Sequence, residues 1–421
     1  MRKIIFLITV GVIVNAMNIS TLLDSVKNIP DTKLDEVAIN EMKVNKKNVS
    51  YALFPKVNLF ANVIHYSSPY NLRPMPPTES KKIGAKGGGY WFSRNIKKVG
   101  FNISMPLFVK EIYDNKKKME YLLKSTKYKA KLNLLQRQAI LIGEVSNFNY
   151  LKDLKSALLK KKESIKTTLK AVEVGVKVGR VPEFKLERLK DALLNIDIKI
   201  QNINNMLNAS KANIYKLTKI KIDKRIEFSA FMPTKKEFLA LKPVKNLIEA
   251  SKYSIAAAKD KKIPKISLVA QGYRAFGKAY DNGNDLALNF ANIGIYLNWE
   301  IFNKQNNASL KKAKVEYIKN TLLFEKTLKD LKAKEQELLG NLKNLKKAIL
   351  MAKESVEIKK ELLKSAKVAF KLNRMSVDDY LRYEYDLANA KANLANLVAL
   401  KNKMIATLAF IYGNNLERIF K

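Results

Sequence analysis

The chain has 421 residues, a formal net charge of +41 and no cysteine, which excludes disulfides, cysteine zinc sites and a lipid-modified N-terminal cysteine. A basic chain suggests nucleic acid or an anionic surface as a partner, but here the 79 Lys and Arg are spread along predicted helical faces among the 38 Asp and Glu. This distribution is typical of solvated helices rather than of an arm that binds nucleic acid.

The N-terminal stretch MRKIIFLITVGVIVNA has the three parts of a secretory signal. Arg2 and Lys3 form a basic start, an apolar run covers Ile4–Val14, and small residues favour cleavage after Ala16. The apolar run is too short to cross a bilayer as a helix. We therefore expect residues 1–16 to be a signal peptide. No later segment offers about 20 uninterrupted apolar residues, so the exported chain is expected to be soluble or to span a membrane by strands.

The rest of the chain contains one pattern twice. A shift of 194 residues places Arg180 on Arg374 and aligns GFNISMPLF with GIYLNWEIF. Further upstream, a shift of 209 aligns FPKVNLFA with IPKISLVA, and the difference of 15 is additional Pro- and Gly-rich loop in the first copy. The predicted boundaries are 17–218 for the first repeat, 219–242 for a linker and 243–421 for the second repeat.

In each repeat a helix, two strand-like runs, a long helix and a shorter helix follow one another. The first repeat has these elements at about 32–51, 54–66, 98–108, 110–177 and 183–218. The second has them at about 244–259, 263–275, 289–301, 303–372 and 377–412. At 1.5 Å per residue the long helices extend about 100 Å and the shorter ones about half of that. We therefore expect two helical hairpins, at 110–218 and 303–413.

The second strand of each repeat alternates between apolar and polar residues, as a membrane-spanning strand does. The residues predicted to face lipid are Phe101, Ile103, Met105, Leu107, Ile295, Leu297, Trp299 and Ile301. Aromatic residues gather near the strand ends, as they do at membrane interfaces, namely Tyr90, Trp91, Phe92, Tyr273, Phe276 and Tyr280. A half-buried strand of a soluble sheet shows the same alternation, but nothing sheet-like is predicted nearby to cover these strands.

The number of strands has a consequence for assembly. Four strands cannot close a barrel around a lumen, and open sheet edges are not tolerated in lipid. If these strands span a membrane, several chains must contribute to one barrel. We therefore expect an obligate oligomer.

Each long helix turns sharply into the shorter one, with the sequences VGRVPEFKL and NRMSVDDYL. In the first turn, Gly179 suits the end of a helix, Pro182 the start of the next, and Glu183 its positive end. Together with Pro55 and Pro264, which begin the first strands, these turns and the duplicated order of elements resemble the TolC-like outer-membrane factors over essentially the whole mature chain.

The resemblance implies a mainly α protein with a small transmembrane β part. Such a protein is a homotrimer, in which an α-helical coiled-coil barrel in the periplasm joins a 12-stranded barrel in the outer membrane. The resemblance also implies the exit duct of a tripartite efflux pump or a type I secretion system. Its partners are then outer-membrane lipid, a periplasmic adaptor and, through the adaptor, an inner-membrane pump. It implies no cofactor, no metal and no nucleic acid.

The resemblance also assigns roles to the two turns. The adaptor is expected to contact Gly179, Arg180, Val181, Pro182, Asn373, Arg374, Met375 and Ser376. In the family, acidic residues after the second turn narrow the closed entrance. Asp379 occupies the first such position, with Asp378 beside it, but the second position is Arg382. Both a gate of interchain Asp379–Arg382 pairs and ordinary solvated charges are compatible with this sequence.

Two other classes of protein compete with a channel. The first is a soluble periplasmic or surface coiled-coil scaffold with small capping sheets, and the second is a nucleic acid-binding protein whose signal segment is misread. An enzyme is not expected, since the lone His65 lacks a second His or Cys and no carboxylate lies beside a nucleophile. For a channel, we expect weak cation selectivity, or anion preference if the excess Lys lines the wall.

Overall fold

The computed structural model describes residues 18–372 and 374–421, so the predicted signal peptide at 1–16 and the turn residue Asn373 lie outside the described residues. The described chain forms two compact units. One consists of the described residues up to Ala38 together with Lys127–Pro243 and Phe324–Lys421. The other consists of Ile39–Thr126 and Val244–Leu323. Each unit takes segments from both predicted repeats, whose boundaries remain a prediction.

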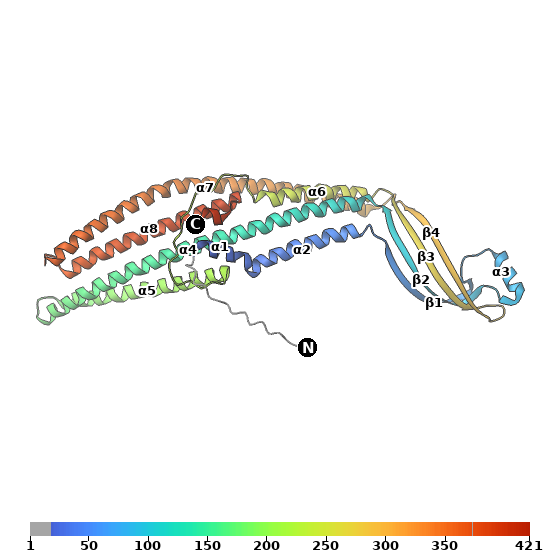
Figure 1. Cartoon of the computed structure of the whole chain (residues 1–421), viewed down its shortest axis with the longest axis horizontal. Coiled ribbons are helices and arrows are strands. Elements are labelled where there is room, and N and C mark those ends of the chain that lie inside the picture. The colour runs from blue at the N-terminus through green and yellow to red at the C-terminus, as the bar shows by residue number, and fades with distance from the viewer. Residues whose placement is uncertain (1–17, 373) are drawn as a thin grey trace, which may run out of the picture. The chain divides into compact units, whose positions relative to one another are not determined.

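Long helices make up most of the described chain (Figure 1). The main helices are α2 (Pro30–Tyr51), α4 (Lys110–Lys177), α5 (Glu183–Thr218), α6 (Leu241–Asp260), α7 (Lys304–Lys371) and α8 (Val377–Tyr412). The short ones are α1 (Ile19–Ser25), α3 (Pro77–Ile83) and α9 (Leu416–Ile419), with single turns η1 (Val26–Asn28) and η2 (Gly84–Gly88). Of these, α4, α5 and α8 begin and end at the residues predicted from the sequence.

Four antiparallel strands form one sheet in the order β1-β2-β3-β4 (Figure 1). The strands are β1 (Lys56–Asn71), β2 (Phe92–Phe108), β3 (Lys265–Lys278) and β4 (Asp285–Asn298). Compared with the prediction, β1 ends later and β2 begins earlier, because Tyr70 and Asn71 pair with Ser93 and Phe92 beyond an irregularity in the register. In the described chain, β1 and β4 each pair along one side only.

The unit that contains the sheet also holds helical segments from both repeats. In this unit, the Tyr121 ring of α4 stacks on Tyr253 of α6, with ring centroids 5.6 Å apart. Asn320 of α7 donates a buried hydrogen bond to Ser251 of α6, with a nitrogen–oxygen distance of 2.7 Å. These contacts join α4, α6 and α7 next to the sheet.

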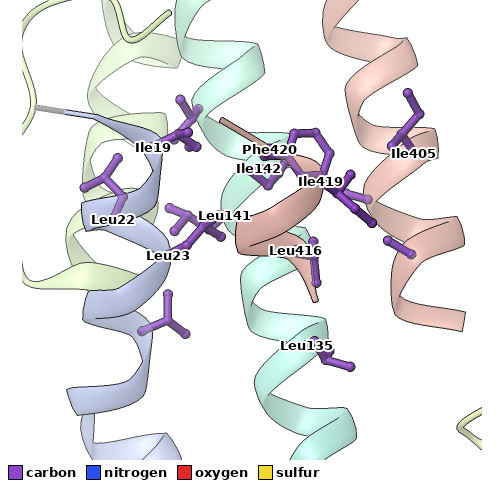
Figure 2. Packing of buried hydrophobic residues seen from close by; sticks show 14 of the residues in the cluster. Ile19, Leu22, Leu23, Leu135, Leu141, Ile142, Ile405, Leu416, Ile419 and Phe420 are labelled. Carbon is purple, nitrogen blue, oxygen red and sulfur yellow. The ribbon is translucent and has the colours of Figure 1, made fainter. Parts of the chain in front are cut away.

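The other unit has a large apolar core to which α1, α4, α8 and α9 contribute (Figure 2). The sequence gives α1 no predicted role, yet Leu22 and Leu23 on this helix are fully buried, as is Phe420 after α9. Side chains of this size contribute about 1.5–3 kcal/mol each when fully buried. In addition, the Gln138 side-chain amide of α4 donates to the Leu23 carbonyl at 3.1 Å. The core therefore ties segments from both ends of the described chain to α4.

Helix α8 is more apolar than expected from the absence of a long uninterrupted apolar run in its sequence. Among the described residues it alone has, over Asp378–Tyr412, the length and composition of a membrane-crossing helix. This is weak support for a span, because a core helix has the same composition. The last turns of α8 do lie in the core, where Ala406, Leu408 and Ala409 are buried.

Candidate functional site

The sheet has one apolar face, defined here by the four-residue rows Val57–Ile103–Ala270–Ile293 and Leu59–Phe101–Gly272–Ala291. Side chains alternate between the faces of a strand, so each row lies on one side. Leu59 is 86% exposed and Ile293 is 72% exposed. A contiguous exposed apolar surface of this kind marks contact with a partner or with lipid.

Five of the predicted lipid-facing residues lie on this apolar face. Phe101 and Ile103 belong to its rows, Met105 pairs with Leu268, and the last two are Ile295 and Leu297. Ile295 is 70% exposed.

The other three predicted lipid-facing residues lie outside the regular pairing. Leu107 falls at the register shift between Pro106 and Phe108. Trp299 and Ile301 follow the end of β4, because Asn298 makes the last pair, with Lys265 at the start of β3. The Trp299 indole instead donates to the Lys262 carbonyl at 3.0 Å. The prediction that the fourth strand continues to 301 is therefore wrong.

The opposite face, called the polar face below, carries a row of four carboxamides. Asn58, Asn102, Gln271 and Asn292 are paired in succession across the four strands. Each side chain offers two N–H donors and an acceptor oxygen. Alternation within a single strand indicates the polar positions, but only the register between strands aligns these amides at one level.

An aromatic row follows the amide row on the polar face, formed by Phe60, Gly100, Tyr273 and Phe290. The Tyr273 and Phe290 rings lie 5.0 Å apart. Gly100 is required here, because a Cβ at this position would come within 2.3 Å of the Gly272 carbonyl oxygen. Tyr273, which the sequence placed among the interface aromatics, therefore lies on the polar face.

At the end of the sheet away from the long helices, the segment 72–91 packs against the polar face. Leu72 is fully buried in a cluster with Ile96, Ala275 and Leu286, and Trp91 packs at its edge. The Leu72 amide donates to the Trp91 carbonyl at 3.2 Å. The additional loop of the first repeat, SSPYNLRPMPPTESKKIGAKGGG at 67–89, is therefore divided: its first five residues extend β1, and the rest belong to this segment.

The first hairpin turn is closed by backbone hydrogen bonds. Gly179 has φ of 69°, in the left-handed region that favours glycine. The Arg180 amide donates to the Gly175 carbonyl at 2.8 Å, and Pro182 directly precedes α5. Val181 packs so closely on Gly175 that a Cβ there would come within 2.6 Å of its methyl group.

The second hairpin turn has the same closing bond, from the Arg374 amide to the Ala369 carbonyl at 2.8 Å. Ser376 caps α8, since its hydroxyl oxygen accepts from the Asp379 amide at 3.0 Å. Its hydroxyl also donates to the Asp379 carboxylate at 2.9 Å. Each turn is therefore closed onto the preceding helix by a backbone hydrogen bond from its arginine.

The candidate gate residues have partners within one chain. Asp379 and Arg382 form an ion pair of 3.3 Å on α8, with side chains 48% and 67% exposed. Asp378 accepts a hydrogen bond from the Thr168 hydroxyl of α4. Exposed pairs contribute about 0–1 kcal/mol, so the Asp379–Arg382 pair holds the two side chains together only weakly. The role of Thr168 could not be read from the sequence, because it depends on α4 packing beside α8.

A metal site does not arise from the described residues, in which no group of three His, Cys, Asp or Glu side chains is placed to hold an ion. The Nδ1 atom of His65 lies 2.7 Å from the Asn95 side-chain oxygen on the neighbouring strand.

Several solved outer-membrane channels have this fold. The Campylobacter jejuni CmeC channel is 17% identical and aligns over 94% of this chain and 85% of its own, with a TM-score of 0.74. The Vibrio cholerae outer membrane protein VceC is 13% identical, with coverages of 94% and 96% and a TM-score of 0.70. The open state of the Neisseria gonorrhoeae MtrE channel is 14% identical and aligns over 95% of this chain and 90% of its own, with a TM-score of 0.67. No protein-family model matches the sequence, and no curated protein matches it either. These likenesses confirm, for a single chain, the mainly α fold with a small antiparallel sheet that was expected from the resemblance to TolC-like outer-membrane factors.

Proposed function

We propose that this chain is one protomer of a homotrimeric outer-membrane channel, the exit duct of an efflux pump. The fold shared with solved outer-membrane channels supports this function. In the proposed trimer the helices lie in the periplasm, and three sheets of four strands close a 12-stranded barrel. The protein then conducts solutes and catalyses no reaction.

The observation that carries the proposal is the sheet itself. It has an exposed apolar face, a polar face, and edge strands β1 and β4 that pair along one side only in the described chain. Lipid offers no hydrogen bonds to open edges, so a spanning sheet must close on itself or on its copies. The edge of β4 on one protomer is therefore proposed to pair with the edge of β1 on the next.

A soluble scaffold with capping sheets is the competing function, and the exposure of the apolar face argues against it. A soluble sheet would expose to water a face that includes Leu59 and Ile295, which are 86% and 70% exposed. Burying apolar area contributes roughly 25 cal/mol per Å², which makes such exposure unfavourable unless lipid or a partner covers it. In the proposed barrel, lipid covers this face.

The two hairpin turns are the proposed contact with a periplasmic adaptor. Arg180 and Arg374 occupy equivalent positions of the two repeats, and the amide of each donates to a carbonyl five residues earlier. The intrachain pair of Asp379 and Arg382 is proposed to lie at the entrance, where adaptor contact would separate these exposed charges at small cost. A type I secretion system would use the same turns, and identifying the adaptor crosslinked to Arg374 distinguishes the two kinds of export.

A matched pair of charge insertions on β1 tests the function. Leu59 lies on the apolar face and Asn58 on the polar face. Arginine facing lipid near the bilayer centre costs about 2–4 kcal/mol, whereas arginine facing a lumen is tolerated. We therefore expect Leu59→Arg to abolish trimer assembly in the outer membrane, and Asn58→Arg to retain it.

Outer-membrane fractionation and heat-dependent mobility on gels measure this assembly, and planar-bilayer recordings measure conductance. A wild-type protein released by salt alone would contradict the channel. So would a Leu59→Arg variant that assembles as well as Asn58→Arg.

A further inference from the structure

Apart from Asp285, which pairs with Lys278 where β3 ends and β4 begins, the four strands contain cationic residues and no carboxylate. Over residues 56–64, 96–106, 265–276 and 287–298 there is no Asp or Glu. The same segments contain Lys56, Lys97, Lys98, Lys265 and Arg274. Charge in these four segments is therefore of one sign, whereas the helices carry Glu and Asp among their lysines.

The register divides these cations between the faces. Lys97 pairs with Val63 and Phe276, and Arg274 pairs with Val99, on the side of the apolar face. Lys56, Lys98 and Lys265 lie on the polar face. Lys265 has a carboxylate partner, Glu111, at 3.4 Å.

Lys98 has the most enclosed position of the cations on the polar face. It is half-buried, whereas Lys56 is exposed. Its ammonium nitrogen lies 5.0 Å from the centre of the Tyr273 ring, and its row includes Ala275, which is buried beneath the segment 72–91. In the described part of the chain no carboxylate forms an ion pair with Lys98, and its contact is an uncharged aromatic ring, so no adjacent anion offsets the ammonium group.

We propose that the barrel lumen prefers anions and that Lys98 is the residue that sets this preference. The inference depends on the proposed function, in which the polar face lines the lumen and three copies of Lys98 surround it. The row of Asn58, Asn102, Gln271 and Asn292, two levels away, is neutral and offers both N–H donors and acceptor oxygens, so it does not oppose the charge of Lys98. The solutes that pass most easily are then anionic, such as carboxylates and sulfonates.

Two adjacent lysines provide a matched experiment. Lys98→Gln removes a charge from the polar face, and Lys97→Gln removes the same charge from the other side. The reversal potential of wild-type and variant channels in planar bilayers under a KCl gradient gives the chloride-to-potassium permeability ratio. A unit charge about 8 Å from an ion in water changes the occupancy of that ion by about twofold, in opposite directions for chloride and potassium. Because Lys98→Gln removes one charge from each of three protomers, it should lower the ratio by more than about fourfold.

Lys97→Gln should leave the ratio unchanged, and Lys98→Glu should reverse the preference. At about 1 M salt, where screening acts over about 3 Å, the difference between wild type and Lys98→Gln should nearly disappear. Wild-type channels that prefer potassium, or equal responses to the two glutamine variants, would overturn this inference and leave the channel function standing. A wild-type protein that forms no channel overturns both proposals.

Discussion

Two carboxyl groups, of half-buried Asp114 and buried Glu335, show how single residues respond to their surroundings in this lysine-rich chain. Burial, and then a hydrogen bond with Asp260, raise the pKa of Asp114 to about 6. Among the described residues, the Asp260 Oδ2 atom is buried without a hydrogen-bond partner, while Oδ1 lies 3.2 Å from Lys110. A proton on Asp114 can be donated to Asp260, which satisfies the buried oxygen. By contrast, hydrogen bonds from Tyr412 and Lys235 lower the pKa of Glu335.

Asp114→Asn tests the shared proton. The pKa of Asp114 is 3.8 when unperturbed and about 6 in the folded protein, so its stabilising effect is complete below pH 3.8 and is lost as the pH rises through 6. Asparagine stays neutral and can still donate to Asp260. We expect this variant to exceed wild type in free energy of unfolding by about 1–2 kcal/mol at neutral pH, with no difference near pH 4.

Urea unfolding of the detergent-solubilised protein, followed by circular dichroism at each pH, measures this difference. Glu120→Gln on the same helix is the control, because this exposed residue pairs only loosely with Lys46, at 3.6 Å. A pH-independent effect of Asp114→Asn would rule out the shared proton.

Glu335→Gln should have the opposite effect. The Glu335 side chain is 10% exposed and lies 2.9 Å from Lys235, and it accepts a hydrogen bond from the Tyr412 hydroxyl. Because its folded pKa is lowered, its stabilisation is present above pH 4.5 and is lost as the pH falls below that value. Hydrogen bonds to a charged group contribute about 1.5–3 kcal/mol each, so we expect a loss of that order at pH 7.

The same unfolding experiment at pH 7 and pH 4 measures the loss, which should shrink in acid. The matched control is Glu337→Gln, two residues away, whose side chain is 53% exposed in its pair with Lys334. Its effect should stay below about 0.5 kcal/mol. Equal losses for both variants would mean that Glu335 acts only as a surface charge.

At the scale of elements, the helices could be predicted because each one carries its own boundary signals. Gly179 and Pro182 separate α4 from α5, and both helices have the predicted bounds. The strand ends could not be predicted in the same way. The bounds of β1 and β2 depend on the packing of Leu72 and Trp91 against the sheet, which joins residues distant in sequence. Helix α1 was missed although Asn18 caps its start, because a helix of seven residues shows little periodicity and is stabilised by the burial of Leu22 and Leu23 in the core.

Two glycine substitutions separate the role of a turn from that of a helix. Gly179 has φ of 69° and Gly340 lies inside α7, and a Cβ at either position meets no heavy atom within 4 Å. Alanine at Gly179 should destabilise the protein by about 1–2 kcal/mol, because an L-residue strains in the left-handed region. Alanine at Gly340 should stabilise it by about 1 kcal/mol, since alanine favours the helix interior.

Thermal unfolding of both variants under identical detergent conditions compares the two effects. The opposite signs are the expected result, since neither change alters packing. A stabilising Gly179→Ala would show that the turn does not need its left-handed residue, and the proposed contact surface would lose the backbone geometry on which it depends.

At the scale of the whole molecule, the medium around a residue depends on assembly as well as on its strand. Alternation predicts that Ile295 and Asn292 lie on opposite faces, and the register confirms this. Alternation within one strand does not predict that Asn292 aligns with amides on three other strands, or that Lys98 lies beside Tyr273. Those relations depend on how the strands pair. In a single chain both faces of the sheet meet water. In the proposed trimer one meets lipid and the other a water-filled lumen.

Cysteine labelling distinguishes these two situations, and the native chain, with no cysteine, is a clean background. Ile295→Cys and Asn292→Cys each place one thiol on β4, three residues apart, at positions that are both exposed in the single chain.

A soluble sheet would let a charged maleimide modify both at similar rates. In liposomes containing the assembled trimer, we expect rapid modification at Asn292→Cys and protection at Ile295→Cys, because the reactive thiolate forms poorly in hydrocarbon and the charged reagent does not enter it. A lipid-soluble maleimide should reach Ile295→Cys, which separates protection by lipid from burial against protein. Equal labelling by the charged reagent would contradict a membrane-spanning barrel.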